Sequence, residues 1–270
     1  ACPGTKGSNT EEASVKLFPD SEIDFYPDFS DVFEAVENGS ADYGVLPIEN
    51  STAGDIRQTY DLLAKYNFYI CKRTQIKINH CLAAKPGADI KTIYSHEQAL
   101  KQCFRCLKEY PARQVPYANT ALAAEMVANS DDNTIAAICS ERCAKLYGLE
   151  TVKRDIADNP DNTTRFICIS KRPEVTPDAD IISICMSLPH TTGSLYRMLI
   201  RFALYGLNIT KIESAPVPQA KQDIKRETFD VVFYLDFEGN ALDPEVVRLM
   251  TILEEEMKYF KFLGNYKHFD

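Results

Sequence analysis

The chain has 270 residues, of which 45% are hydrophobic and 26% are charged, proportions typical of a soluble globular protein with one large domain or two smaller ones. It carries 30 lysines and arginines against 39 aspartates and glutamates, a net charge of −9, and it has no basic run of the kind that binds nucleic acid. No apolar stretch approaches the roughly 20 residues of a membrane-spanning helix, and the N-terminus lacks the basic-then-apolar pattern of a signal peptide. These features predict a cytoplasmic protein that uses neither nucleic acid nor a membrane as a partner.

Through most of the first 170 residues, short apolar runs alternate with longer amphipathic stretches. The apolar runs predict a strand that ends at residue 94 and further strands at residues 43–48, 67–78, 80–84, 134–139 and 166–170. The amphipathic stretches predict helices at residues 31–38, 56–66, 95–110, 121–129 and 141–147. This alternation favours an α/β fold with mainly parallel strands.

The segment 171–180 changes character, because its two prolines, several charges and lack of apolar periodicity are typical of a linker. The patterns that follow predict, in order, a strand, a helix, two strands, a helix and a strand, at residues 181–187, 193–205, 207–212, 229–237, 243–257 and 259–264. The order βαββαβ is that of the ferredoxin-like split unit.

The nine cysteines are an odd number, and most of them lie inside apolar segments. In a chain of this length they are interpreted as reduced, packed core residues and not as a disulfide framework. Cys103 and Cys106 form a single CxxC, and Cys139 and Cys143 lie four residues apart, but neither pair has the turn residues of a zinc knuckle. We therefore expect no metal site.

Several stretches match one family. They are GTKGSN at 4–9, DVFEAVENGSADYGVLPIENSTAG at 31–54, YSHEQALKQC at 94–103, LYGL at 146–149 and, most diagnostic, NTTRF at 162–166. On these motifs the chain resembles prephenate dehydratase, which converts prephenate to phenylpyruvate in phenylalanine biosynthesis. The C-terminal part resembles the ACT regulatory domain of that family, with TGSLYR at 192–197 and ESAP at 213–216 falling on its two effector motifs.

The resemblance implies a catalytic region over residues 1–175 with two lobes, like a periplasmic binding protein, and a site in the cleft. Lobe one would comprise residues 1–76 and 163–175, lobe two residues 77–162, and the ACT domain residues 181–270. The implied reaction expels CO2 and water from a dicarboxylate and leaves an aromatic ring, so no cofactor is required. Its central need is an acid near the departing hydroxyl, helped by orientation and fixed dipoles.

The resemblance makes Thr164 the catalytic candidate, as hydrogen-bond donor or acid to the departing hydroxyl. From the residues alone, Thr164 is a polar residue that enters a strand. Arg165 could bind a substrate carboxylate in a two-pronged way, or it could form a structural salt bridge with Asp158 or Asp161. Phe166 would shape the site.

Asn50, Ser51 and Thr52 directly follow the predicted strand 43–48, where polar groups lie at the mouth of an open α/β sheet or form a capping turn. Ser8 and Asn9 follow a glycine-containing turn in the same way. The resemblance adds four further substrate-contacting candidates, Ser95, Gln102, Asn119 and Thr163. Ser95 is also expected to cap the helix that carries Gln102.

His96 invites assignment as the general acid, but no carboxylate partner is evident for it. The alternative is a surface histidine at a helix N-terminus. A hydrolase function has no support in the sequence, because neither a G-x-S-x-G nor an H-E-x-x-H motif is present.

In the last domain, residues 190–195 join the first strand to the first helix. A glycine there permits close approach of a ligand, and the helix N-terminus favours a carboxylate, which suits L-phenylalanine as effector at an interface between ACT domains of a homodimer or homotetramer. The candidate effector-binding residues are His190, Gly193, Ser194, Leu195, Glu213 and Ser214. Ala215 stands where the family carries arginine, so phenylalanine control could be altered.

The sequence thus favours prephenate dehydratase with allosteric control by L-phenylalanine. Arogenate dehydratase, whose substrate differs only in a side-chain amine, is the close alternative. A non-catalytic amino-acid-sensing protein that kept both lobes is the alternative from another class, and the intact NTTRF motif argues against it.

Overall fold

The computed structural model describes residues 1–216 and 231–267, so the first two residues of the predicted strand 229–237 lie outside it. The chain divides into two compact units. Unit 1 comprises Ala1–Ala35, Val45–Ile56 and Gln75–Phe166, and unit 2 comprises Val36–Gly44, Arg57–Thr74 and Ile167–Asp270. The predicted lobe and domain boundaries stay predictions.

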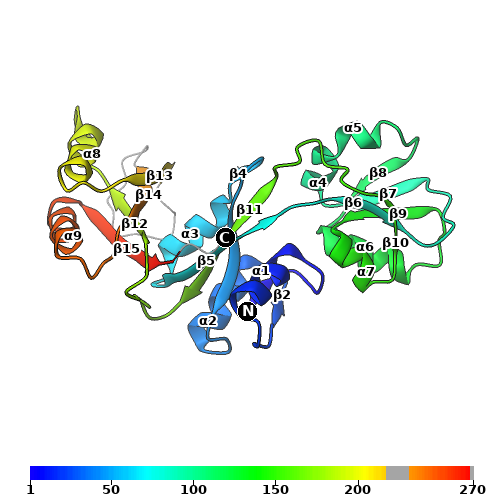
Figure 1. Ribbon diagram of the computed structural model, residues 1–270, viewed down its shortest axis with the longest axis horizontal. Coiled ribbons are helices and arrows are strands. Elements are labelled where there is room, and N and C mark those ends of the chain that lie inside the picture. The colour runs from blue at the N-terminus through cyan, green and yellow to red at the C-terminus, as the bar shows by residue number, and fades with distance from the viewer. Residues whose placement is uncertain (217–230, 268–270) are drawn as a thin grey trace. The chain divides into compact units, whose positions relative to one another are not determined.

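Figure 1 labels most of the elements, which are numbered in chain order. The strands are β1 (Cys2–Pro3), β2 (Phe25–Tyr26), β3 (Gly44–Asn50), β4 (Gly54–Asp55), β5 (Tyr69–Lys77), β6 (Cys81–Ala84), β7 (Thr92–Ser95), β8 (Arg113–Pro116), β9 (Ile135–Cys139), β10 (Glu150–Lys153), β11 (Thr163–Ser170), β12 (Ile181–Ser187), β13 (Ile209–Pro216), β14 (Val231–Glu238) and β15 (Tyr259–Tyr266). The helices are α1 (Asn9–Leu17), α2 (Phe29–Asn38), α3 (Arg57–Lys65), α4 (Glu97–Gln102), α5 (Phe104–Leu107), α6 (Thr120–Asn129), α7 (Glu141–Leu146), α8 (Ser194–Leu204) and α9 (Pro244–Glu256).

Most predicted elements are confirmed, but the helix expected at 95–110 is wrong in two respects. It is broken at Cys103, whose φ of −113° and ψ of 22° depart from helical values, so that α4 and α5 are separate. Its N-cap is His96 and not Ser95, because Ser95 is the last residue of β7. The short edge strands β8 and β10 were not predicted.

Unit 1 contains a five-stranded sheet in the order β10-β6-β9-β7-β8. β7 pairs parallel with β8 and β9, whereas β6 pairs antiparallel with β9 and β10, so β6 runs against the other four strands. The expectation of mainly parallel strands is therefore wrong for β6. The loop 85–91 that joins β6 to β7 contains no helix and reverses the chain, while helices supply the crossovers between the parallel strands.

Both faces of this sheet are buried because helices cover each of them, and its alternating side chains pack into a separate core on each face. In β6, Cys81 and Ala83 pack with α6 and α7 on one face, and Leu82 and Ala84 pack with α4 and α5 on the other. Figure 1 shows the two helix pairs on opposite sides of the sheet. All nine cysteines are buried and free, as predicted for core thiols.

Unit 2 contains a four-stranded sheet in the order β13-β14-β12-β15, with antiparallel pairing throughout. The helices α8 and α9 cover one face (Figure 1), and they bury Ile184, Phe202 and Leu249 in one core. The other face contacts residues 57–74 of the same unit, where the rings of Tyr60 and Tyr234 lie 4.7 Å apart. The predicted order βαββαβ is observed.

A second four-stranded sheet has the order β4-β3-β11-β5. β3 ends at Asn50 and its neighbour β11 begins at Thr163, so this pairing brings the turn after β3 next to the NTTRF motif. None of the helices described is long and apolar enough to cross a membrane.

Candidate active site

Unit 1 holds a cavity of about 410 Å³, located where β3 ends and β11 begins. The described residues that line it include no Asp, Glu, Lys or Arg. Seven of the predicted catalytic and substrate residues lie in its wall, namely Ser8, Asn9, Asn50, Gln102, Asn119, Thr164 and Phe166. The polar groups of the site are therefore hydroxyls, amides and imidazoles.

The pleat of β11 decides which residues of the NTTRF motif reach the cavity. Thr164 and Phe166 lie on one face of the strand, are buried and line the cavity, whereas Arg165 lies on the other face and is not in its wall. Arg165 Nη1 instead lies 3.0 Å from Glu49 Oε2. The salt-bridge alternative for Arg165 is thus the one observed, with a partner other than Asp158 or Asp161.

The side chain of Asn50 has a fixed orientation. Its Oδ1 accepts hydrogen bonds from the backbone N–H groups of Thr52, at 3.0 Å, and Ala53, at 2.8 Å. Because backbone N–H groups can only donate, the other end of the amide must be Nδ2. That nitrogen donates to Thr164 Oγ1 at 2.9 Å and to Asn162 Oδ1 at 2.8 Å.

The direction set at Asn50 passes along a chain of hydrogen bonds. Since Asn162 Oδ1 accepts, its Nδ2 donates to Gln102 Oε1, at 3.2 Å. The same oxygen lies 3.1 Å from His80 Nε2, and a carbonyl oxygen can only accept, so His80 carries its proton on Nε2. Gln102 Oε1 therefore accepts from Asn162 on one side and from His80 on the other, which leaves Gln102 Nε2 as a donor for a ligand.

His80 is 5% exposed, and burial is the larger influence on it, lowering its pKa from the usual 6.5, while the hydrogen bond with Gln102 opposes that shift. A lowered pKa keeps the imidazole neutral at neutral pH, which agrees with its single donated hydrogen bond.

The Thr164 hydroxyl has a hydrogen that it does not donate to any described residue. Its oxygen accepts from Asn50, and among the described residues no acceptor for its own hydrogen is present. It can therefore donate to a ligand in the cavity. The amide hydrogen of Asn50 would at the same time stabilise negative charge that develops on Thr164 Oγ1.

Two helices begin at the cavity. Ser8 Oγ caps α1 by accepting from Glu11 N at 3.1 Å, and Asn119 Oδ1 caps α6 by accepting from Leu122 N at 2.7 Å. The cavity wall includes both capping residues and the first residue of each helix. The backbone amides of helix starts attract anions, so these two ends supply the positive potential that no charged side chain provides.

A family model described as prephenate dehydratase matches residues 1–174. The chain belongs to the prephenate dehydratase family. It is 37% identical over 276 residues to arogenate dehydratase/prephenate dehydratase 2, chloroplastic, of Arabidopsis thaliana, covering 98% of this chain and 72% of that protein. Members of this family are enzymes, and so is this chain.

Solved structures share the α/β fold with its mixed sheets. A prephenate dehydratase from Arthrobacter aurescens in complex with L-Phe is similar over 99% of this chain and 90% of that one, with a TM-score of 0.86 and 31% identity. GqqA, described as a novel type of quorum quenching acylase, matches over 99% of this chain and 97% of that one, with a TM-score of 0.86 and 27% identity.

Four of the substrate candidates predicted from the sequence do not reach the cavity. Ser95 is fully buried, and its Oγ donates to Ile138 O at 2.7 Å. Ser51 Oγ accepts from Thr163 N at 2.9 Å, and Thr52 Oγ1 donates to Asn162 Oδ1 at 3.3 Å. Ser51, Thr52 and Thr163 brace the turn that orients Asn50.

His96 lines the cavity and caps α4, because its Nδ1 accepts from Gln98 N at 3.2 Å. The helix N-terminal position that was the alternative to a general acid is therefore observed. Within the described ranges, no group of three or more His, Cys, Asp or Glu side chains could hold a metal ion.

Sequence reasoning missed His80 and Asn162 as parts of the site. Asn162 is the first residue of NTTRF but was given no role, and His80 lies at the start of a run read as apolar strand. Both are polar residues that are buried, with His80 5% exposed and Asn162 1% exposed. Only the contacts across the site reveal that both are hydrogen-bonded to Gln102.

Unit 2 has its own cavity of about 450 Å³ at the start of α8. His190, Ser194 and Leu195 line it, and Gly193, with a φ of 79°, is the N-cap of the helix. Glu213 and Ser214 lie on β13 and are not in the wall. Ser214 pairs with Phe233, which does line the cavity. Ala215 is buried, at 2% exposure.

Proposed function

We propose that this enzyme converts prephenate to phenylpyruvate, CO2 and water. The observation that carries the proposal is the Thr164 hydroxyl, which accepts from Asn50, keeps its own proton and lies in a cavity walled by uncharged groups. A donor in that state suits a leaving hydroxyl, which needs a proton and no nucleophile.

In the proposed reaction the bond between the ring and its carboxylate breaks, and the electron pair enters the ring. The bond between the opposite ring carbon and its hydroxyl breaks, and the hydroxyl leaves as water with a proton delivered through Thr164 Oγ1. The Asn50 amide supports Thr164 as it gives up the proton, and solvent restores it. Aromatisation drives the step, so no cofactor is required.

The dianionic substrate would be held by backbone amides at the starts of α1 and α6, together with Gln102 Nε2. The expectation that Arg165 binds a substrate carboxylate is not part of this proposal, because Arg165 is paired with Glu49 on the other face of β11. Uncharged donors also leave the ring carboxylate free to depart as CO2, since a tight ion pair would stabilise it.

The cavity favours prephenate over arogenate. Arogenate carries an ammonium group where prephenate has a keto oxygen, and a buried ammonium needs a carboxylate or several acceptors. No carboxylate is present among the described residues of the wall, while donors are plentiful. The relative from Arabidopsis thaliana is named for both substrates, so both must be tested.

The acylase activity named for GqqA is not favoured here. A hydroxyl that attacks an acyl group needs a base to take its proton. The described hydrogen-bond partner of Thr164 is Asn50, which donates to it and cannot act as that base.

The test is to supply prephenate, and separately arogenate, at neutral pH and to follow phenylpyruvate and phenylalanine. We expect phenylpyruvate to form, with a kcat/KM at least about tenfold above that for arogenate, a factor worth about 1.4 kcal/mol. The absence of turnover with either substrate would refute the proposal, and a higher kcat/KM for arogenate would refute the substrate assignment.

We propose that the βαββαβ part of unit 2 is an ACT domain of ferredoxin-like fold and that its cavity binds L-phenylalanine. The first turn of α8 would receive the carboxylate, and Leu195 and Phe233 in the wall would contact the ring. The Arthrobacter aurescens enzyme was solved with L-Phe, which supports the choice of ligand.

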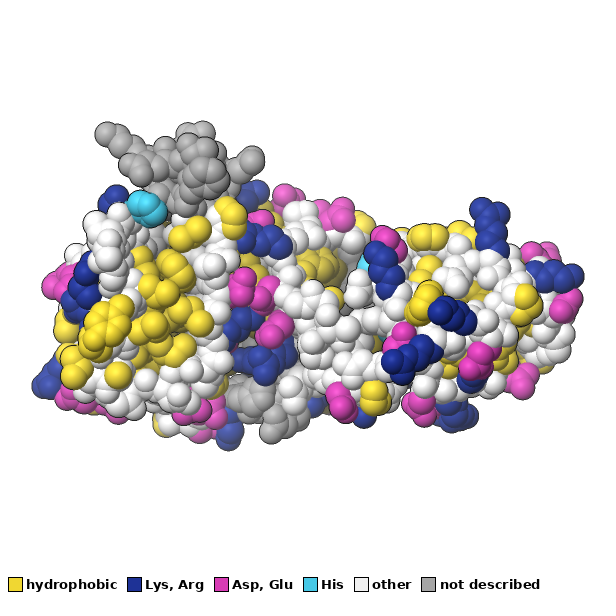
Figure 2. All heavy atoms as spheres, turned by 90° about the horizontal axis from the view of Figure 1, so that it is seen from above, with side chains coloured by type: hydrophobic (Ala, Val, Ile, Leu, Met, Phe, Trp, Pro, Cys, Tyr) yellow, Lys and Arg dark blue, Asp and Glu magenta, His cyan; other side chains and the backbone are white. Residues whose placement is uncertain are grey.

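We also propose that a second copy of the chain covers this region. On α8, Tyr196, Ile200 and Leu204 repeat every four residues, and Tyr196 and Leu204 are 67% and 79% exposed. Figure 2 shows hydrophobic side chains gathered at the left end of the face in view, where α8 lies in Figure 1. Leu195 and Val231 belong both to the cavity wall and to the exposed apolar residues, so the cavity opens onto this surface.

Two measurements test these assignments. Phenylalanine should raise the midpoint of thermal unfolding, and Leu204→Glu should shift the mass in analytical ultracentrifugation toward a monomer. Val247→Glu on α9, whose parent side chain is 48% exposed, is the matched control and should leave the mass unchanged. The absence of any phenylalanine effect would refute the effector site, and a monomeric parent protein would refute the dimer. The cytoplasmic location expected from the sequence stays a prediction.

A further inference from the structure

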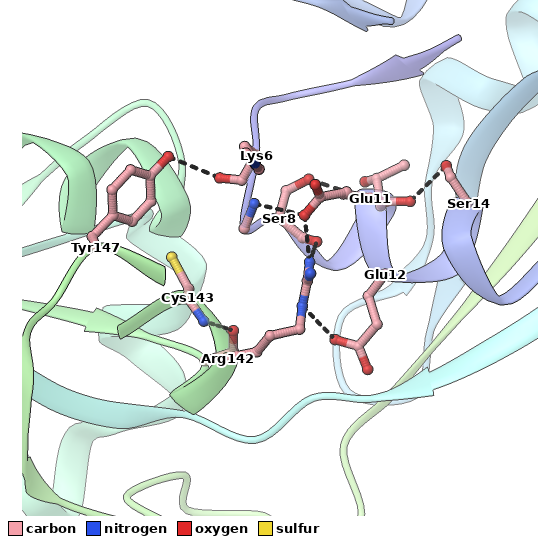
Figure 3. Close-up of polar contacts among 11 residues, drawn as sticks. Lys6, Ser8, Glu11, Glu12, Ser14, Arg142, Cys143 and Tyr147 are labelled. Atoms are coloured by element: carbon pink, nitrogen blue, oxygen red, sulfur yellow. Dashed lines mark hydrogen bonds and ion pairs between the residues drawn. The ribbon is translucent and has the colours of Figure 1, made fainter. Parts of the chain in front are cut away.

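A salt bridge beside the cavity joins two segments that lie far apart in the sequence. The guanidinium of Arg142, on α7, lies 2.6 Å from Glu11 Oε2, on α1, and also donates to the backbone carbonyl of Ser8 at 3.1 Å. Figure 3 shows the Arg142 side chain reaching from α7 to the start of α1, with Glu12 on its other flank. Arg142 Nε lies 3.6 Å from Glu12 Oε2.

Glu11 links this ion pair to the turn before α1. Its Oε2 accepts from Gly7 N at 2.7 Å, while its own backbone N–H is capped by Ser8 Oγ. This is a capping box displaced by one residue, since the carboxylate reaches the residue before the N-cap. Glu11 is 7% exposed, so its charge is largely withdrawn from water.

The turn is also held from the side of α7. Tyr147 Oη donates to Lys6 O at 2.9 Å. Gly7 has a φ of 88°, and a Cβ there would lie 3.0 Å from Cys143 Sγ. The turn is therefore closely packed against α7, and Arg142 supplies the charged part of that contact.

We propose that Arg142 is a positioning residue that acts through Glu11 to hold the turn at residues 4–8 and the start of α1 against the cavity. Arg142 does not line the cavity, whereas Gly4, Ser8 and Asn9 do. Without Arg142, the Glu11 carboxylate would stand uncompensated beside the amides that attract the substrate's negative charge. The effect on the substrate rests on the proposed function, whereas the effect on the turn does not.

The first experiment uses no substrate, so it tests the positioning even if prephenate is not turned over. Amide hydrogen exchange in residues 4–10 is compared for the parent protein, Arg142→Met and Arg154→Met. Arg154 is the matched control, because it pairs with Glu141 of α7 at 3.0 and 3.1 Å without touching the turn. We expect Gly7 to exchange about tenfold faster in Arg142→Met and to be unchanged in Arg154→Met.

The second experiment separates charge from packing. Arg142→Met should raise the KM for prephenate about tenfold, with kcat within about threefold of the parent value. Adding Glu11→Gln to Arg142→Met should restore much of the affinity, because the amide still accepts from Gly7 N and no buried lone charge remains. If Gly7 exchanges equally in the two arginine variants, or if the double variant binds no better than Arg142→Met, the proposal is overturned.

Discussion

Asn50→Asp is the substitution that most sharply tests the direction of the hydrogen-bond chain. The new side chain has the same shape, and one carboxylate oxygen can still accept from the N–H groups of Thr52 and Ala53. The other oxygen would replace Nδ2, which now donates to Thr164 Oγ1 at 2.9 Å and to Asn162 Oδ1 at 2.8 Å. Two donors are thus exchanged for one acceptor.

The chain can respond only by reversing. Thr164 would turn its proton toward the carboxylate, and the amides of Asn162 and Gln102 would flip in turn. His80 would then accept at Nε2, which requires its proton to move to Nδ1. The bonds to Thr164, Asn162, Gln102 and His80 are kept, but Thr164 no longer has a proton for the leaving hydroxyl.

Removing one aligned donor from a transition state costs a factor of about 10² to 10³ in kcat. We expect that loss for Asn50→Asp with prephenate. Asn50→Ala is the matched control, because it deletes the support of Thr164 but leaves the Thr164 proton free, and we expect only about a tenfold loss from the missing hydrogen bond.

The assay is kcat for phenylpyruvate formation, with nitrogen NMR of His80 to report its tautomer. Asn50→Asp should be slower than Asn50→Ala, and its His80 should carry the proton on Nδ1. If Asn50→Asp keeps kcat within about threefold of the parent value, or is faster than Asn50→Ala, the directional chain is refuted.

Two further predictions concern stability. Burial lowers the pKa of His80 from 6.5, so the unfolded chain binds a proton at this residue more readily than the folded chain does. The stability that His80 contributes is therefore fully present above about pH 6.5, and it is lost as the pH falls through the lowered pKa of the folded state. His80→Gln should therefore flatten the decline of the thermal midpoint on acidification, and an unchanged pH profile would contradict this. Gly264→Ala should cost about 3 kcal/mol or more, because a Cβ at Gly264 would lie 2.0 Å from Ile70 O. Gly206→Ala, where no atom lies within 4 Å, should cost only about 1 kcal/mol of backbone strain, and equal losses of the thermal midpoint in the two variants would argue against the clash.

Apolar periodicity predicted most of the elements because it reports burial on one or two faces, which is a local property. It could not predict that β6 runs against its neighbours, since direction depends on how a loop turns. It also missed the break at Cys103, where the helical pattern of apolar residues continues through a residue with non-helical φ and ψ.

The motifs predicted some residues of the site, and other residues of the site were not predicted. Thr164 and Asn50 lie together, but the alternation of β11 that turns Arg165 away from the cavity follows only when the buried face of the strand is known. His80 gave no local signal, and Asn162 was given no role although it opens NTTRF, because the importance of both comes from contacts with Gln102, which is distant in the sequence. The charge of −9 sharpens this point, since in the proposed function the dianion would be received by helix starts and amides and not by a basic side chain.

The most direct test of the central claim compares Thr164→Val with the parent enzyme. Valine keeps the shape of threonine and removes only the hydroxyl. With prephenate as substrate, we predict that phenylpyruvate formation falls by a factor of about 10³ in kcat while KM stays within about threefold. A Thr164→Val enzyme that keeps kcat within about threefold of the parent value would contradict the account.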